Sequence, residues 1–92
     1  MAAAAFTAAE RAEFASLGWV IFGDMAEPEF GRAIGILIHV RADGELAIQR
    51  RGLDDRWRWV HTSQHASPRV AAWFAADWFY LATGWELLSW RP

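Results

Sequence analysis

The residues best suited to recognition gather in one short stretch in the second half of the chain. Four arginines and two tryptophans flank a predicted turn at 52–55. Guanidinium groups bind carboxylates and phosphates through paired hydrogen bonds, and indoles either stack on planar groups or anchor protein interfaces. We therefore predict a partner-binding hairpin that comprises Arg50, Arg51, Arg56, Trp57, Arg58 and Trp59.

The charge around this stretch bears on the kind of partner. Asp54 and Asp55 lie in the turn itself, and the whole chain has a net charge of −2 at pH 7. Such a balance gives no general attraction to nucleic acid or to anionic membranes. A protein surface is therefore the favoured partner, and a nucleic acid bound by the Arg50–Trp59 hairpin is the alternative.

A second group of charged residues is acidic and lies earlier in the chain. Asp24, Glu27 and Glu29 surround Pro28 in a segment, 24–31, that is predicted to be a loop. An acidic patch can steer a protein toward a basic partner or compete for a nucleic-acid-binding groove, and it can equally serve solubility alone. We treat Asp24, Glu27 and Glu29 as a secondary acidic patch.

Metal binding and catalysis find little support in the sequence. His61 and His65 are four residues apart, but the segment between them is predicted to leave a strand, and no carboxylate has the spacing of a third ligand. No nucleophile-elbow motif surrounds Ser63, and Ser67 is better explained as a helix cap. The seven glycines are scattered and form no phosphate-binding loop. We expect no metal, no cofactor and no enzymatic activity.

The composition limits the size of the core. The chain has 92 residues, of which seven are tryptophan and none is cysteine. Residues 1–92 should therefore form a single domain without disulfides, in which 1–6 are frayed. So small an interior has little room for seven indoles, so at least one or two should be exposed. No signal peptide or membrane span is recognised, which predicts a soluble, cytoplasmic protein.

Two helices are indicated by the residues at their ends. Thr7 and Glu10 have the spacing of a capping box, and Gly18 ends the helix that follows. Ser67 caps a second, longer helix, which Gly84 ends. Bulky apolar residues recur along this second helix at steps of four, four and three. They share one face, which needs a broad apolar surface to lie on: Val70, Phe74, Trp78 and Leu81.

Strands are predicted at 19–22, 33–40, 45–51, 56–62 and 85–90. The strand at 33–40 alternates, so its isoleucines share one face. A three-residue turn at 42–44 pairs Val40 with Leu46 and Ile38 with Ile48, which keeps the apolar faces together. The opposite face of this hairpin should be solvated and carries Leu37, His39, Arg41, Glu45, Ala47, Gln49 and Arg51.

The strand at 56–62 alternates as well. One side should carry Trp57, Trp59 and His61, and the other Arg58, Val60 and Thr62. The elements together predict an α+β fold. It comprises an antiparallel sheet of four to five strands with two helices packed on one face, in the order α-β-β-β-β-α-β.

These observations favour a binding protein over an enzyme. A short, mildly acidic, tryptophan-rich chain without catalytic motifs fits a small inhibitor of a larger protein or complex. Such inhibitors include phage anti-defence proteins of the anti-CRISPR kind and toxin immunity proteins. The exposed aromatic surface should be covered by a partner protein or by a second copy in a homodimer. The alternatives are nucleic-acid binding and a homodimeric small-ligand-binding domain with a pocket between the sheet and the Trp78 helix.

Overall fold

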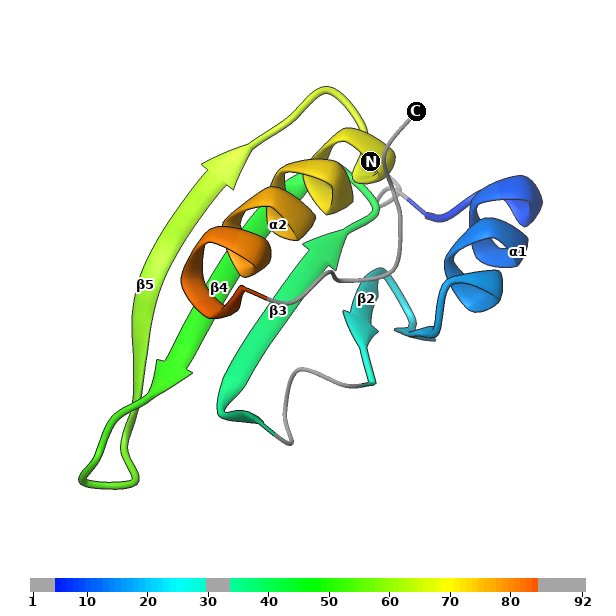
Figure 1. Cartoon of the computed structure of the whole chain (residues 1–92). Coiled ribbons are helices and arrows are strands. Elements are labelled where there is room, and N and C mark those ends of the chain that lie inside the picture. The colour runs from blue at the N-terminus through cyan, green and yellow to red at the C-terminus, as the bar shows by residue number, and fades with distance from the viewer. Residues whose placement is uncertain (1–4, 30–33, 85–92) are drawn as a thin grey trace.

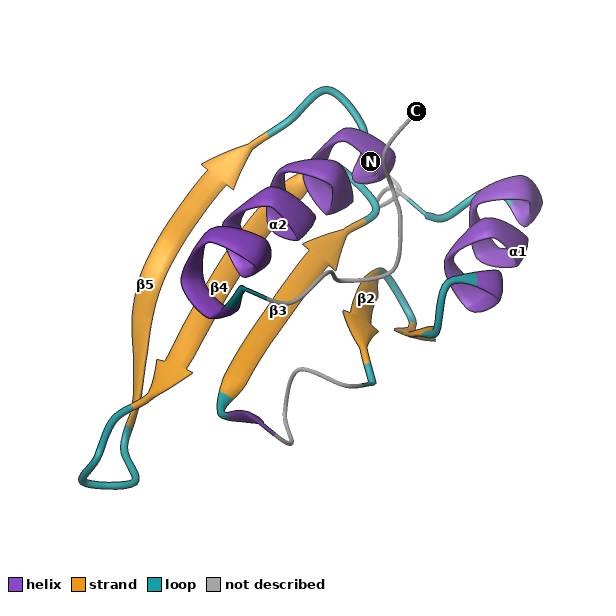
Figure 2. Cartoon of the chain, viewed as in Figure 1, coloured by secondary structure: helices purple, strands orange, loops and turns teal. Residues whose placement is uncertain are grey.

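Five antiparallel strands and two helices make up the described part of the chain. The computed structural model describes residues 5–29 and 34–84, and the strands are neighbours in chain order, β1-β2-β3-β4-β5 (Figure 1, Figure 2). The elements are α1 (Ala8–Ser16), β1 (Trp19–Phe22), β2 (Met25–Pro28), β3 (Ile36–Arg41), β4 (Glu45–Arg51), β5 (Trp57–Gln64) and α2 (Pro68–Thr83). The α+β class is confirmed, although the sheet gains a strand in its first half. The strand predicted at 85–90 lies outside the described residues.

One core joins both helices to the same face of the sheet. The ring of Phe14 in α1 lies edge-to-face on that of Trp19 in β1, with 5.2 Å between the ring centres. Helix α2 lies over β3 and β4, where Ile38 and Ile48 are fully buried. The two helices are also linked to each other, because Arg69 Nε lies 3.2 Å from a carboxylate oxygen of Glu13. The prediction that both helices pack on one face is therefore confirmed.

Strand β2 corrects the prediction of a loop at 24–31. Ala26 is fully buried and pairs with Ile21 on one side and with Val40 on the other. The acidic residues and Pro28 of this segment suggested a loop, but pairing with strands on both sides stabilises a strand of only four residues. Gly23 permits the tight reversal before it, because its φ of 59° lies in the left-handed region.

Helix α1 begins and ends where the sequence indicates. Thr7 Oγ1 accepts the backbone N–H of Glu10 at 3.1 Å, and Glu10 Oε1 accepts the backbone N–H of Thr7 at 2.9 Å, so the capping box is complete. The prediction of a frayed start is wrong for Phe6. Its side chain is buried, and its ring centre lies 5.5 Å from that of Phe14. Burial of this aromatic ring stabilises the segment just before the cap.

The β3–β4 hairpin has the predicted register. Val40 pairs with Leu46 and Ile38 with Ile48, and all four side chains are fully buried. Gly44 has a φ of 93°, and a Cβ there would lie 2.2 Å from the carbonyl oxygen of His65, so only glycine fits the turn. Strand β3 begins at Ile36, later than predicted.

The face of this hairpin that turns away from the helices is only partly solvated. Arg41, Glu45 and Arg51 are exposed, as predicted, but His39 is half-buried. Its Nε2 lies 3.3 Å from Oε2 of Glu27 in the neighbouring strand β2, and Glu27 is only 5% exposed. The prediction of a solvated face is therefore wrong for the middle of the sheet, because a neighbouring strand that the sequence did not reveal lies beside it.

Helix α2 has the predicted ends but buries another face. Ser67 Oγ accepts the backbone N–H of Val70 at 3.2 Å, and Gly84 ends the helix with a φ of 76°. The buried residues are mostly small: Pro68, Ala71, Ala72, Ala75, Ala76 and Phe79. The predicted stripe is not the core face, since Val70, Phe74 and Leu81 are exposed and Trp78 is partly buried. Alanines let the helix lie close to the sheet, and bulky side chains in their place would hold it away.

Candidate interaction surface

The β4–β5 hairpin extends past the C-terminal end of α2 and forms one end of the molecule (Figure 1). Its turn is closed by two backbone hydrogen bonds, from Gly52 N–H to the carbonyl of Arg56 at 2.8 Å and from Asp55 N–H to the carbonyl of Gly52 at 3.0 Å. Asp54 Oδ1 also accepts the backbone N–H of Arg56 at 3.2 Å. The turn is thus well ordered by local bonds, although it lies outside the helix-covered part of the sheet.

A β-bulge at Val60 divides strand β5 into two parts. Gln49 pairs with Trp59 and Ile48 with His61, so Val60 is an extra residue without a partner on β4. Paired residues point to the same face, which places Trp59 with Gln49 on the face away from the helices and His61 with Ile48 on the helix face. The prediction that both tryptophans and His61 share one side is therefore wrong, because it assumed unbroken alternation.

The two indoles of the hairpin lie on the open face of the sheet. Trp59 is 60% exposed and Trp57 is 37% exposed. Trp57 pairs with Arg51, whose guanidinium carbon lies 5.8 Å from the centre of the indole ring. Such an arrangement is a cation–π contact and orients the indole. The prediction that at least one or two tryptophans are exposed is confirmed by this pair.

The Asp54–Arg58 pair braces the helix side of the hairpin. Two hydrogen bonds run from the guanidinium of Arg58 to the two carboxylate oxygens of Asp54, one of them 2.9 Å long. The Arg58 guanidinium, followed by the backbone N–H of Arg56, lowers the pKa of Asp54, and the Asp54 carboxylate raises the pKa of Arg58. The two side chains are 57% and 47% exposed, so the pair fixes geometry more than it adds stability.

Two guanidinium groups of the hairpin are left for other contacts. Within residues 5–29 and 34–84, neither Arg50 nor Arg56 has an ion pair, and both are exposed. Leu53 at the tip is fully exposed. An open hollow of about 410 Å³ lies beside them and is lined by Arg50, Arg51, Gly52, Leu53, Arg58 and Val60. The structure therefore brings the six predicted partner-binding residues to one hairpin, but it distributes them over two faces.

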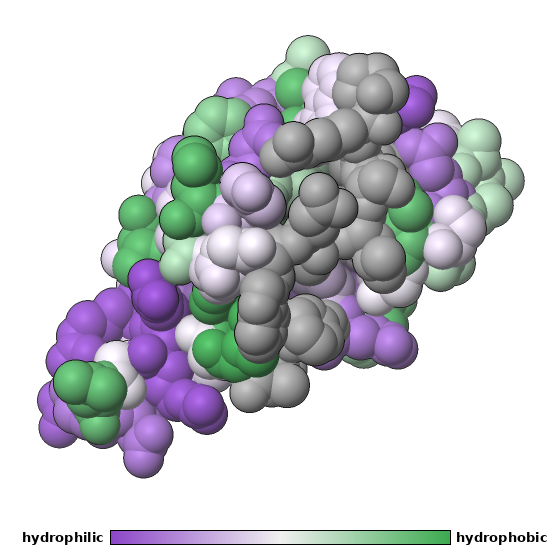
Figure 3. All heavy atoms as spheres, viewed as in Figure 1, coloured by the Kyte–Doolittle hydropathy of each residue, from purple (hydrophilic) through white to green (hydrophobic). Residues whose placement is uncertain are grey.

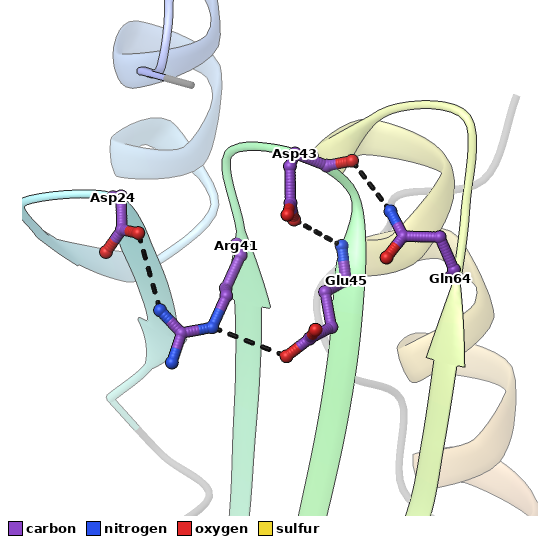
Figure 4. A network of polar contacts seen from close by, with 5 residues as sticks. All are labelled: Asp24, Arg41, Asp43, Glu45 and Gln64. Carbon is purple, nitrogen blue, oxygen red and sulfur yellow. Dashed lines mark hydrogen bonds and ion pairs between the residues drawn. The ribbon is translucent and has the colours of Figure 1, made fainter. Parts of the chain in front are cut away.

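The three acidic residues predicted as a second patch do not lie together on the surface. Asp24 is exposed and its carboxylate lies 3.4 Å from Arg41, which also lies 3.4 Å from Glu45 (Figure 4). Glu29 is exposed, whereas Glu27 is buried beside His39. A buried carboxylate cannot contribute to a surface patch. The acidic surface of this region is instead formed around the β3–β4 turn, where Asp43 joins Asp24 and Glu45 (Figure 4).

The structure also brings together a histidine–serine–histidine chain that the sequence did not single out. Ser63 Oγ lies 2.9 Å from His61 Nε2 and 2.7 Å from His65 Nε2. The ring of Phe74 lies against both imidazoles, with centre distances of 5.2 and 5.1 Å. The spacing of two residues along a strand was the signal that could have revealed the cluster. No carboxylate within the described residues orients either imidazole here, so the cluster does not form a catalytic triad.

Wider comparisons give the chain no functional context. Across the residues that the structure describes, no group of three or more histidine, cysteine, aspartate or glutamate side chains is arranged to hold a metal ion. None of the described helices has the length and apolar character needed to cross a membrane. The chain matches no protein-family model, no curated protein and no solved structure. The β4–β5 hairpin is therefore the surface that bears on the function of this chain.

Proposed function

We propose that this chain is a small, non-enzymatic protein-binding module that inhibits a larger protein or complex. The observation that supports the proposal is the pair of exposed indoles, Trp57 and Trp59, on a hairpin that projects beyond α2 (Figure 1). Neither indole belongs to the core, so folding does not account for them. Tryptophan beside arginine is the composition of interface hot spots. The classes proposed are phage anti-defence proteins, including anti-CRISPR proteins, and toxin immunity proteins.

A protein surface suits this hairpin better than a nucleic acid does. Asp54 already holds Arg58, and Asp55 Oδ1 lies 3.9 Å from Arg51 Nε, so half of the guanidinium groups face a carboxylate of the turn. Nucleic-acid affinity depends on the number of phosphates that free cations neutralise. Within the described residues, Arg50 and Arg56 have no ion pair. Two such cations beside two exposed indoles are better matched to a protein patch that combines apolar groups with carboxylates.

The proposal of a small-ligand pocket under α2 has less support. Ala72, Ala75, Ala76 and Phe79 are buried between the helix and the sheet. They lie against Ile38, Ile48 and the other residues of one continuous core. A ligand pocket needs a hollow lined by apolar groups, and among the described residues these side chains pack against one another between the two layers.

Affinity capture with a matched tryptophan control tests the proposal. The whole chain is immobilised, proteins from the host are captured and identified, and the affinity of each purified candidate is then measured. We expect Trp57→Ala with Trp59→Ala to raise the Kd by about a thousandfold, because hot-spot residues contribute about 2 kcal/mol or more each. Trp73→Ala is the control, since that indole is also at the surface but lies on α2.

Three outcomes would contradict the proposal. The first is equal binding by the hairpin variant and the wild type. The second is an equal loss for Trp73→Ala, which would place the interface on α2. The third is tight binding of a single-stranded oligonucleotide whose affinity falls steeply with salt, which would favour the nucleic-acid alternative. Unchanged circular dichroism of both variants is the check that the fold is intact.

A further inference from the structure

Strand β5 forms an outer edge of the sheet. Among the described residues it pairs with β4 alone, over Trp57–Gln64. Edge strands of this length are usually protected by proline, by lysine or by a covering element, since their unpaired backbone groups attract another strand. Between Trp57 and Gln64 there is no proline and one charged side chain, that of Arg58. The edge is therefore suited to pairing with a further strand.

The backbone groups available at this edge can be identified. His65 donates its backbone N–H to the carbonyl of Gly44 at 2.9 Å, which directs it toward the β4 side. Successive residues of a strand direct their backbone groups to opposite sides, so the N–H groups of Thr62 and Gln64 point away from β4. These two residues lie in the regular part of β5, after the bulge at Val60. They are the donors that a second strand would meet.

The side of α2 that lies above this edge is exposed and largely apolar, although the exposed Asp77 lies among its apolar residues. The stacking of Phe74 on His61 shows that this side of the helix faces β5. Val70 and Leu81 share it by helical spacing, and Leu81 is 83% exposed. Hydrophobic spheres appear beside α2 on the side of β5 (Figure 3). An added strand alone would leave these side chains in water, whereas a strand followed by a helix of the same kind would cover them.

The charge at the two ends of β5 has opposite sign. Near Trp57, the hairpin residues 50–59 include four arginines and two aspartates, which leave a net charge of +2. Near Gln64, the cluster of Asp24, Arg41, Asp43 and Glu45 has three acids and one base, a net charge of −2 (Figure 4). Two copies of β5 in antiparallel orientation place the basic end of each toward the acidic end of the other.

We propose that β5 and the adjoining side of α2 form the interface of a homodimer. The two β5 strands pair antiparallel about a twofold axis, so the two sheets become one, and the two α2 helices meet above the seam. Phe74 and Leu81 are covered by the same residues of the second copy. Trp57 and Trp59 point to the other face of the sheet and stay exposed, so the dimer does not depend on the proposed function.

The mass of the whole chain in solution tests the dimer. Sedimentation velocity over a range of concentrations should give twice the chain mass of 10.4 kDa. Thr62→Pro should give the mass of a single chain, because proline removes an outward N–H and is tolerated on edge strands. Its matched control, Thr62→Val, keeps the N–H and should remain dimeric. Circular dichroism should be the same for both variants.

A second pair of variants tests the contribution of α2. Leu81→Glu should raise the dimer Kd by about ten- to hundredfold, because a charged side chain then replaces a leucine that is buried in the proposed interface. Phe22→Glu is the control, because Phe22 is 57% exposed on β1, at the opposite edge of the sheet. Single-chain mass for the wild type at every concentration would overturn the proposal. So would a dimer that survives Thr62→Pro, or one that Phe22→Glu weakens as much as Leu81→Glu.

Discussion

The two hairpins that share β4 differ in what lies above them. In the β3–β4 hairpin, the paired side chains of Ile38 and Ile48 are fully buried under α2. In the β4–β5 hairpin, Trp59 pairs with Gln49 and is 60% exposed. The same strand therefore takes part in the core on one face of the sheet and in an open surface on the other. Burial in the core explains the apolar residues of the first hairpin, whereas the exposed indoles of the second are the basis of the interface that we propose.

The turns of the two hairpins differ in charge as well. The β3–β4 turn is acidic, and its groups are held by local bonds: Asp43 Oδ1 accepts the backbone N–H of Glu45 at 2.9 Å, and the backbone carbonyl of Asp43 accepts the side-chain N–H of Gln64 at 2.9 Å (Figure 4). The β4–β5 turn is basic and, within the described residues, leaves Arg50 and Arg56 without an ion pair. The two turns of this meander thus have opposite charge, and within the described residues the basic one keeps two guanidinium groups available for a partner.

The largest difference in stability between the two hairpins should appear when one paired apolar residue in each is truncated to alanine. Ile48→Ala should lower the free energy of unfolding by about 2–5 kcal/mol, because it opens a cavity in the covered core. Trp59→Ala should lower it by about 0.5 kcal/mol or less, since it removes an exposed surface group. Urea unfolding followed by circular dichroism measures both. Similar losses for the two variants would show that the β4–β5 hairpin is part of the core.

A pair of glycine substitutions compares two turns. Gly23→Ala should cost about 1–2 kcal/mol, because its φ of 59° is left-handed but no atom lies within 4 Å of the new Cβ. Gly44→Ala has the same backbone cost and also places Cβ 2.2 Å from the carbonyl oxygen of His65, which should add about 1–3 kcal/mol. Thermal and urea unfolding give the difference. Equal losses would mean that the chain after β5 is not held against the β3–β4 turn.

The smallest effect concerns the pH dependence of the Asp54–Arg58 pair. Because the pKa of Asp54 is lowered in the folded state, the pair stabilises the fold above the unfolded pKa of about 3.9. This contribution is lost as the pH falls through the lower, folded pKa. Arg58→Gln should return the pKa of Asp54 toward its ordinary value, as followed by NMR titration of the carboxyl carbon. Arg56→Gln is the control, since it keeps the backbone N–H that Asp54 accepts, and an equal shift there would argue against the direct pair.

Much of the fold could be predicted because its ends and turns depend on local chemistry. Thr7 with Glu10 and Ser67 with Gly84 mark helix ends through hydrogen bonds and backbone angles that neighbouring residues determine. The register of the β3–β4 hairpin follows from its turn length and its alternating isoleucines. Strand β2 could not be predicted in the same way, because its four residues depend on partners from other parts of the chain.

The buried face of α2 shows a second limit of sequence patterns. The bulky residues at Val70, Phe74 and Leu81 have the clearest helical spacing, but the helix buries Ala72 and Ala75. Hydropathy alone does not show how close a helix must approach a sheet, and close approach selects small side chains. The arginines and tryptophans of the candidate site could be recognised in the sequence by residue type. Their division between the two faces of the sheet could not be predicted, because it depends on the bulge at Val60.

The bulge at Val60 also sets the relation between the two proposed surfaces. Without this extra residue, unbroken alternation would turn Trp57 and Trp59 to the side occupied by α2, beside His61 and Phe74. Because of this one extra residue, the indoles of β5 lie on the open face of the sheet. They are thus separate from the proposed dimer contact on the side of α2. In a related chain without this extra residue, the two proposed interfaces would lie on the same side of the sheet and would overlap.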